Sequence, residues 1–349
     1  MVEVYSEINK NGVATLTLNN PKALNSITLN MVQLITKELI KWSEDENVKL
    51  IIMEGAGDRA FCAGGDIKSL YTANVDDQVK AGAAQFFEEE YELDAYIYEY
   101  PKPIIADLSG IVMGGGVGLS YHADYRIVSE KTMWAMPEMS LGFFPDVGAG
   151  YFLNKAPGYY GRYLALTGET INGADALFIN GADYLIPLEK VKEILNVIKE
   201  TNWTEKNIKD KLAAILVSEA DESLLESKIS QYEDSINQHF SFNTVEEIIA
   251  SLETDQSDFA NETRKTILSK SPVSLKVALQ QAVSCENKTL QEALIQDEVL
   301  AKNFLEHADF FEGIRSVLID KDRMPNYQYK TLSDVDEDLV NSFFKKSFK

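Results

Sequence analysis

Cysteine, histidine and basic residues are scarce in this sequence. Among 349 residues there are two cysteines and three histidines, and 33 Lys and Arg stand against 55 Asp and Glu, a formal net charge of −22. Two cysteines are too few for a disulfide framework, and Cys62 and Cys285 lack the spacing of a metal site. The negative charge argues against nucleic-acid and anionic-membrane partners, which bind clustered basic residues.

Long apolar runs are also missing. The sequence contains no stretch of about 18 apolar residues, the length of a membrane-spanning helix, and no basic-then-apolar signal segment at its start. We therefore expect a cytoplasmic protein. With 45% hydrophobic residues the chain can bury a full core, and its length favours one large domain with an appendage, or two domains.

Strand and helix patterns alternate in the first half of the chain. The alternating run 13–18 predicts a strand, the helical spacing after Thr28 predicts a helix as far as Ser43, and the apolar run 50–53 predicts a second strand. The same patterns predict helices over 78–100, 117–123 and 159–166, and strands over 104–108, 125–128 and 183–186.

Strand patterns stop beyond Pro187. The remaining segments have helical spacing and little glycine, and predict helices over 189–200, 204–217, 222–238, 244–253, 258–270, 272–285, 289–306 and 311–319. The sequence therefore predicts an α/β fold, with an α/β core over residues 1–187 and a helical C-terminal region over 188–349.

Residues 109–151 combine glycines with two unusual acids. The glycines at 114–116 follow an apolar run and precede a short helical segment, so they can leave backbone N–H groups uncovered. Glu138 and Asp146 each follow a proline and lie among apolar residues, a setting that perturbs the pKa of a carboxyl group. This stretch predicts a site in which backbone donors face two carboxylates.

Two further features allow two interpretations each. The pair Gly64-Gly65 follows an apolar strand and predicts either an ordinary turn, which the residues alone favour, or a second source of N–H donors. Glu90 shares a helical stripe with Phe86 and Leu93, so it points into a polar pocket or the face is partly solvated. The acidic neighbours of Glu90 favour the solvated face.

The sequence does not match the nucleophile-elbow or dinucleotide-binding motifs. Ser120 stands in a sequence that resembles a nucleophile elbow, but the final glycine is missing and the serine would lie inside a helix. Structural roles are expected for His122, His239 and His307 because nothing pairs them with a nucleophile. No G-x-G-x-x-G dinucleotide motif is present.

Taken together, the motifs resemble the crotonase (enoyl-CoA hydratase/isomerase) superfamily, and within it the 3-hydroxyisobutyryl-CoA hydrolases. The matching segments run in the family's order through most of the chain and are residues 20–25, 61–67, 113–118, 136–138, 142–148 and 309–322. The resemblance implies a spiral of ββα turns. It also implies an oxyanion hole formed by the amides of Gly65 and Gly115, which would hold the thioester carbonyl of an acyl-CoA.

The resemblance assigns roles to the acids. Hydratases of the superfamily place a glutamate two residues after the triple glycine, where this chain has Gly118, so hydration should be weak or absent. Glu138 matches the acid that hydratases and hydrolases share, and Asp146 matches the hydrolase pattern. Glu90 corresponds to a glutamate that is expected to contact the substrate.

The implied activity is hydrolysis of a short-chain 3-hydroxyacyl-CoA, with 3-hydroxyisobutyryl-CoA of valine breakdown as the expected substrate. An enoyl-CoA hydratase or isomerase and a non-catalytic CoA-binding protein are the alternatives. No cofactor is expected, because coenzyme A is part of the substrate. Superfamily relatives often form trimers or hexamers, so a homo-oligomer is one alternative. The other is a single chain in which the helical region 188–349 completes or caps the site of the catalytic core 1–187.

Coenzyme A should contact two loops. The resemblance places it against the first loop and beside the oxyanion loop, at Lys22, Ala23, Leu24, Ala63, Asp66 and Ile67. Lys22, Lys68 and Lys102 are candidates to offset the CoA phosphates, although an exposed lysine is by default a solvated one.

Overall fold

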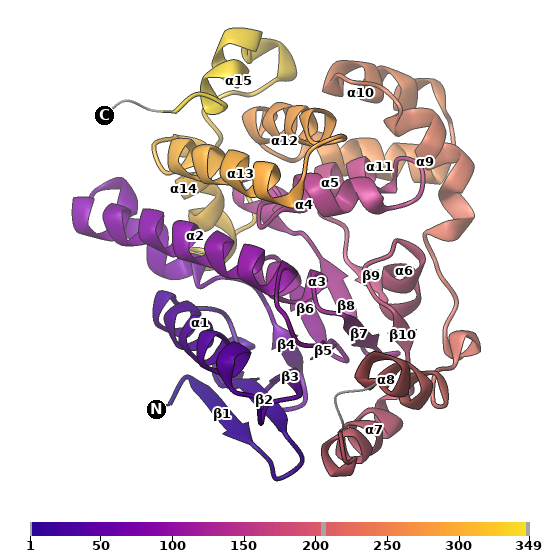
Figure 1. The fold of residues 1–349 in the computed structure, drawn as a ribbon. Coiled ribbons are helices and arrows are strands. Elements are labelled where there is room, and N and C mark those ends of the chain that lie inside the picture. The colour runs from indigo at the N-terminus through magenta and orange to yellow at the C-terminus, as the bar shows by residue number, and fades with distance from the viewer. Residues whose placement is uncertain (1, 204–206, 347–349) are drawn as a thin grey trace. The chain divides into compact units, whose positions relative to one another are not determined.

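The computed structural model describes residues 2–203 and 207–346, which form two compact units. The first, here the sheet unit, comprises residues 1–65, 92–134 and 171–230, and the second, here the helical unit, comprises 66–91, 135–170 and 231–349. Figure 1 labels the elements of both. Each unit is described by itself.

A six-stranded sheet forms the centre of the sheet unit. Its order is β1 (Val4–Ile8), β2 (Val13–Leu18), β3 (Leu50–Gly55), β5 (Ile104–Asp107), β7 (Tyr125–Val128) and β10 (Tyr184–Leu185). β1 pairs antiparallel with β2, and the other neighbours are parallel. The strands predicted within residues 13–186 are therefore confirmed, whereas β1 was not predicted.

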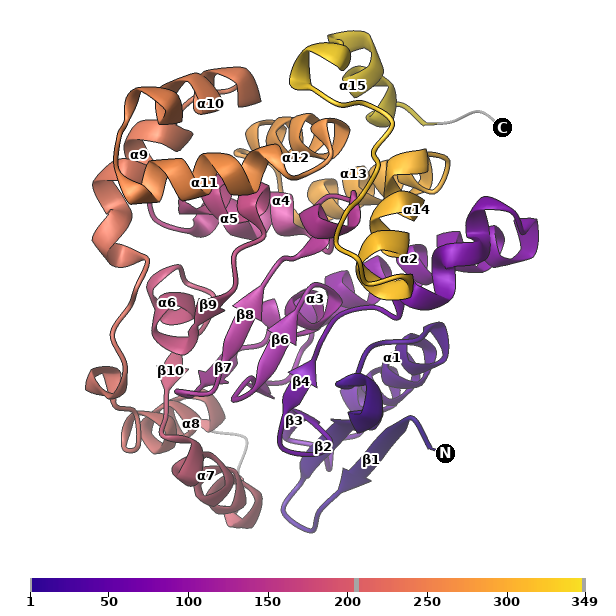
Figure 2. The same cartoon turned by 180° about the vertical axis from the view of Figure 1, so that it is seen from behind.

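A second sheet of short strands accompanies the first (Figure 2). Its order is β4 (Ala60–Cys62), β6 (Ile111–Met113), β8 (Met133–Ala135) and β9 (Ile171–Asn172). Along the chain, β3 and β4, β5 and β6, and β7 and β8 contribute one strand to each sheet in turn. This alternation is the expected ββα spiral.

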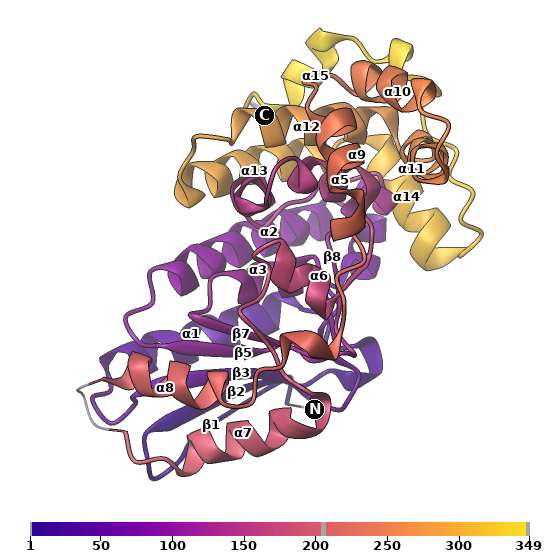
Figure 3. The same cartoon turned by 90° about the vertical axis from the view of Figure 1, so that its right-hand side faces the viewer.

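Helices pack against the strands of both sheets. In the sheet unit these are α1 (Leu29–Glu44), α3 (Gly115–Tyr121), α6 (Gly173–Phe178), α7 (Leu188–Glu200) and α8 (Ile208–Val217). The hydroxyl of Thr28 caps α1 by accepting from Met31 N, as predicted. Figure 3 shows α7 and α8 beside the strands. Val191 and Leu212 of these helices share one apolar core with Ile52 of β3.

α7 and α8 thus complete the core of the sheet unit instead of joining the later helices. The division at residue 187 was predicted on function, between a catalytic core and a region that completes or caps the site. It stays a prediction.

Helices dominate the helical unit. α2 (Asp77–Tyr98) contributes its residues up to Tyr91. The others are α4 (Ala149–Phe152), α5 (Tyr160–Thr167), α9 (Glu233–Phe240), α10 (Val245–Thr254), α11 (Asp258–Leu268), α12 (Pro272–Ser284), α13 (Leu290–Phe304), α14 (Ala308–Ile314) and α15 (Glu337–Phe343). In the described part of the chain, no helix has both the length and the apolarity needed to cross a membrane.

The predicted helix over 222–238 is wrong. The buried carboxylate of Asp175 accepts from Ser227 Oγ at 2.8 Å and from the backbone N of Ile229 at 3.0 Å. These bonds hold the segment outside a helix, and α9 begins only at Glu233. Residues 204–206 of another predicted helix lie outside the described residues.

Candidate active site

Two glycine loops are adjacent in the sheet unit. β4 leads into Gly64, whose φ is +100°, and β6 leads into Gly114, whose φ is +51°; both values favour glycine. Ile27 N donates to Gly64 O at 2.9 Å and so fixes the first loop. A Cβ added to Gly64 would lie 3.6 Å from Gly115 N. The loops that carry both predicted oxyanion donors are therefore neighbours.

Gly115 is the first residue of α3, where backbone N–H groups have no acceptor within the helix. α3 packs directly against β4, because a Cβ on Gly116 would lie 2.5 Å from Cys62 O. Cys62 is buried, as predicted, and its Sγ accepts from Gly64 N at 3.3 Å. Close packing at Gly116 thus determines where the first amide of α3 points.

Both predicted acids are buried in the helical unit. Glu138 is 8% exposed and Asp146 is 5% exposed. The residues between them exclude water, since Phe143 stacks on Phe87 and Phe144 stacks on Phe304. The first acid begins the 3-10 turn Glu138–Leu141.

Burial alters the acidity of both groups. It raises the pKa of Asp146 to about 7, although the Tyr91 hydroxyl donates to Asp146 Oδ2 at 2.6 Å and opposes the rise. Burial, and then repulsion by Asp146 and Glu90, raises the pKa of Glu138 well above its usual value. Two like charges close together in a dry site favour keeping a proton on the pair.

Glu90 is only 2% exposed, so the solvated interpretation is wrong. Its neighbours Glu88 and Glu92 are exposed on another face of α2, while Phe86 and Phe87, one turn earlier, are buried like Glu90. The acidic neighbours of Glu90 therefore gave the wrong prediction, and its position on the apolar stripe of the helix gave the right one. Asp94, one turn further along α2, is also buried and was missed.

The loop that carries Asp146 has strained backbone. Val147 has φ +53°, a left-handed conformation that costs a β-branched residue roughly 1–3 kcal/mol. Gln281 Nε2 donates to Pro145 O at 2.9 Å, and Gly148 N donates to Asp297 Oδ2 at 2.8 Å. These two bonds hold the loop on either side of Val147.

Sequence reasoning missed Tyr91, Gln281 and Asp297. A signal existed for Asp297, which lies on the apolar stripe of α13 between Leu294 and Leu300 and is fully buried. It is the same signal that Glu90 gave: a carboxylate at a position where helical spacing requires an apolar residue.

The predicted CoA-contacting residues are exposed or partly buried. Lys22 and Ala23 are exposed in the 3-10 turn Pro21–Ala23, and Lys68 is exposed. The other four, Leu24, Ala63, Asp66 and Ile67, are partly buried. Their assignment to coenzyme A stays a prediction.

Lys102 has a structural contact instead. Its Nζ donates to Asp45 O at 2.7 Å and to Trp42 O, which satisfies carbonyl groups at the end of α1. Burial lowers the pKa of this lysine.

Ser120 and His239 have structural hydrogen bonds. Ser120 lies inside α3, as predicted, and its Oγ donates to Gly116 O at 2.7 Å. His239 bridges Ser251 Oγ at 2.8 Å and Asp255 Oδ2 at 3.0 Å, an order of groups that resembles a triad. However, Ser251 is in the interior of α10 and not at a strained turn, so the histidine joins α9 to α10.

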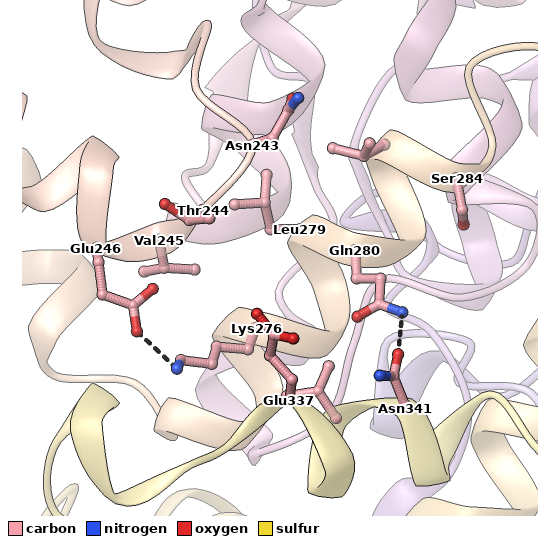
Figure 4. A pocket seen from close by; sticks show the side chains of 12 residues that line it. Asn243, Thr244, Val245, Glu246, Lys276, Leu279, Gln280, Ser284, Glu337 and Asn341 are labelled. Carbon is pink, nitrogen blue, oxygen red and sulfur yellow. Dashed lines mark hydrogen bonds and ion pairs between the residues drawn. The ribbon is translucent and has the colours of Figure 1, made fainter.

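A separate cavity of about 540 Å³ lies between α10, α12 and α15 (Figure 4). Its lysine, Lys276, pairs with Glu246 at 2.6 Å, and Gln280 Nε2 donates to Asn341 Oδ1 at 3.1 Å. None of the residues that line this cavity is a predicted site residue. Among the described residues, no group of three or more His, Cys, Asp or Glu side chains could hold a metal ion.

Comparison with known proteins gives the family. The sequence model described as enoyl-CoA hydratase/isomerase matches residues 13–344. The chain belongs to the enoyl-CoA hydratase/isomerase family. This family membership and the crotonase fold confirm the resemblance that the motifs indicated.

Relatives within the family are similar over nearly their full length. The human protein named 3-hydroxyisobutyryl-CoA hydrolase, mitochondrial, is 42% identical over 343 residues, which cover 96% of this chain and 87% of the relative. The Danio rerio protein of the same name is 39% identical, with 98% and 88% covered.

Two solved structures of the family have the same fold. A carnitinyl-CoA dehydratase from Mycobacterium thermoresistibile has a TM-score of 0.91 at 35% identity and covers 100% of this chain and 98% of its own. An enoyl-CoA hydratase from Rhodobacter sphaeroides 2.4.1 has a TM-score of 0.88 at 33% identity, with 98% and 97% covered.

Proposed function

We propose that the protein hydrolyses a short-chain 3-hydroxyacyl-CoA thioester, most specifically 3-hydroxyisobutyryl-CoA, to the free hydroxy acid and coenzyme A. The observation that supports this most directly is the 42% identity over 343 residues to the human protein named 3-hydroxyisobutyryl-CoA hydrolase. The buried acids Glu138 and Asp146 supply suitable chemistry, and Gly118 leaves the second acid of a hydratase unfilled.

Thioester hydrolysis requires three things of this chain. The amides of Gly65 and Gly115 would stabilise the oxyanion of the tetrahedral intermediate, a contribution that typically amounts to roughly 10²–10³ in rate per donor. Glu138 would provide the oxygen nucleophile or activate it. Asp146, with a pKa near 7, can carry a proton to the departing CoA sulfur at neutral pH. One water adds across the C–S bond, which gives a carboxylic acid and a thiol.

Two routes fit this arrangement. In the first, Glu138 attacks the thioester carbonyl and forms a mixed anhydride, which water then cleaves. In the second, Glu138 removes a proton from a water that Asp146 orients, and this water attacks directly. Single turnover in ¹⁸O-labelled water separates them, because label enters the Glu138 carboxylate only if the anhydride forms.

The function is tested by a thiol-release assay with a panel of short acyl-CoA thioesters, run beside hydration of crotonyl-CoA. We expect release of CoA from 3-hydroxyisobutyryl-CoA and little hydration. Glu138→Gln should lose nearly all turnover and Asp146→Asn most of it, each with the fold intact. Hydration without thioester cleavage would instead support a hydratase, the function named for the Rhodobacter sphaeroides structure.

Glu90 is proposed to contact the acyl group. Its burial on α2 beside Tyr91, which bonds Asp146, supports a place near the acids. Glu90→Gln should therefore change the order of preference among hydroxylated and unhydroxylated acyl groups.

A further inference from the structure

Asp297 is a buried carboxylate for which the proposed chemistry has no role. It lies on α13 with none of its surface exposed. Its Oδ2 accepts from Gly148 N at 2.8 Å and its Oδ1 accepts from Gln281 Nε2 at 2.7 Å. Both oxygens therefore act as acceptors, which is the arrangement that an ionised carboxylate satisfies.

Gln281 on α12 extends the connection to the other side of the same loop. Its Nε2 donates to Pro145 O at 2.9 Å as well as to Asp297. The two side chains therefore hold residues 145 and 148, which flank Asp146 and Val147. The left-handed conformation of Val147 persists only where its surroundings impose it, and these bonds do so.

We propose that Gln281 and Asp297 form a clamp that positions the Asp146 carboxyl for thioester cleavage. The proposal rests on the proposed function, because it assigns the clamp to the same acid. Neither clamp residue needs to touch the substrate, so both are positioning residues. Their loss should lower turnover far more than it weakens substrate binding.

The two halves of the clamp differ in charge. Tyr91 from α2 bonds Asp146, and Glu138 from the 3-10 turn and Asp297 from α13 interact with its charge. Glu90 from α2 acts on Tyr91 and Glu138, and Lys288 is the cation that acts on Asp297. Burial raises the pKa of Asp297 well above its usual value, and the charge of Asp146 adds to this rise, whereas Gln281 is neutral. The charged forms of Asp146 and Asp297 therefore disfavour each other, so Asp297→Asn removes a group that is coupled to the ionisation of Asp146, and Gln281→Met does not.

The test uses Asp297→Asn and Gln281→Met in the full chain with 3-hydroxyisobutyryl-CoA as the probe. Each variant should lower kcat by about 10- to 100-fold and change KM by less than about threefold. Because Asp146 must be protonated to act as the proton donor, its ionisation sets the alkaline limb of kcat/KM, which should move to lower pH in Asp297→Asn alone. Gln280→Met is the matched control: Gln280 is the next residue on α12, but it lines the separate cavity and bonds Asn341 (Figure 4). Its kcat should stay within about twofold of wild type.

A double-mutant cycle separates positioning from general stability. In the Asp146→Asn background, Asp297→Asn should cost little further turnover, and independent, additive losses would overturn the clamp. Asp175→Asn removes another buried, multiply bonded aspartate, from the sheet unit, and should lower stability without moving the pH profile.

A crystal structure of Asp297→Asn gives a readout that needs no activity. We expect residues 145–148 to relax and Val147 to leave the left-handed region, and an unchanged loop would overturn the clamp. Normal turnover by Asp146→Asn would overturn the role of that acid and the clamp with it. An impaired Asp146→Asn beside normal Asp297→Asn and Gln281→Met would overturn the clamp alone.

Discussion

At the scale of single residues, the acid pair couples proton affinity to folding. Burial raises the pKa of Asp146 to about 7 and that of Glu138 well above its usual value, whereas unfolded carboxyl groups titrate near about 4. The folded state therefore binds more protons than the unfolded state between these values. The stabilisation from protonated, buried acids is complete below about pH 4 and is lost as pH rises through about 7.

The first prediction follows from this loss of stability with rising pH. Asp146→Asn cannot ionise, so its melting temperature relative to wild type should increase as the pH is raised from about 5 to 8. Thermal melts of both proteins across this range provide the measurement, with Asp175→Asn as a control aspartate. A difference that is constant with pH, or that falls, would mean that the Asp146 pKa is not raised.

At the scale of elements, the place of α3 depends on one close contact. A Cβ on Gly116 would lie 2.5 Å from Cys62 O, so α3 cannot approach β4 as closely with any larger residue. The same displacement would move Gly115 N, the proposed oxyanion donor.

The second prediction compares two glycines. Gly116→Ala should lower stability by about 1–3 kcal/mol through overpacking and reduce kcat at least about tenfold. Gly82, inside α2, has no atom within 4 Å of an added Cβ, so Gly82→Ala should stabilise by roughly 0.5–1 kcal/mol and leave kcat unchanged. Urea unfolding and thiol release measure both. Equal behaviour of the two variants would contradict the close-packing argument.

The third prediction concerns Lys102, which bonds carbonyl groups at the end of α1. Lys102→Met should lower the free energy of unfolding by about 1–2 kcal/mol and leave KM for the CoA substrate unchanged. The exposed lysines Lys22 and Lys68 give the contrast, because Lys22→Ala and Lys68→Ala should raise KM with little change in stability. A raised KM in Lys102→Met alone would return this lysine to the phosphate-binding candidates.

At the scale of the whole molecule, the net charge of −22 opposes an anionic substrate. Salt screens this repulsion, since the Debye length falls from about 30 Å at 0.01 M to about 8 Å at physiological ionic strength. The fourth prediction is that kcat/KM rises about twofold or more as salt is raised over this range. A control with a neutral thioester, such as an acyl-pantetheine, should show no rise. A fall of kcat/KM with salt would indicate that a local basic patch dominates.

The elements with a clear apolar pattern could be predicted from the sequence, and most strands of the second sheet could not be. β2, α1 and β3 show clear periodicity, whereas β4 and β6 have three residues each and form through pairing with strands distant in sequence. In the candidate site, Glu138 and Asp146 were found because prolines and apolar residues mark them. Tyr91 and Gln281 act through contacts between elements, which a single sequence does not display, whereas Asp297 gave a signal as a carboxylate on the apolar stripe of its helix.

The strand order of the large sheet has a consequence for synthesis. The order β1-β2-β3-β5-β7-β10 follows the order of the chain, so each new strand docks on the free edge left by the one before. A nascent polypeptide leaving the ribosome from its N-terminus can therefore extend the sheet in one direction without waiting for later residues. Only after β10 do α7 and α8 emerge to close the face on which they pack.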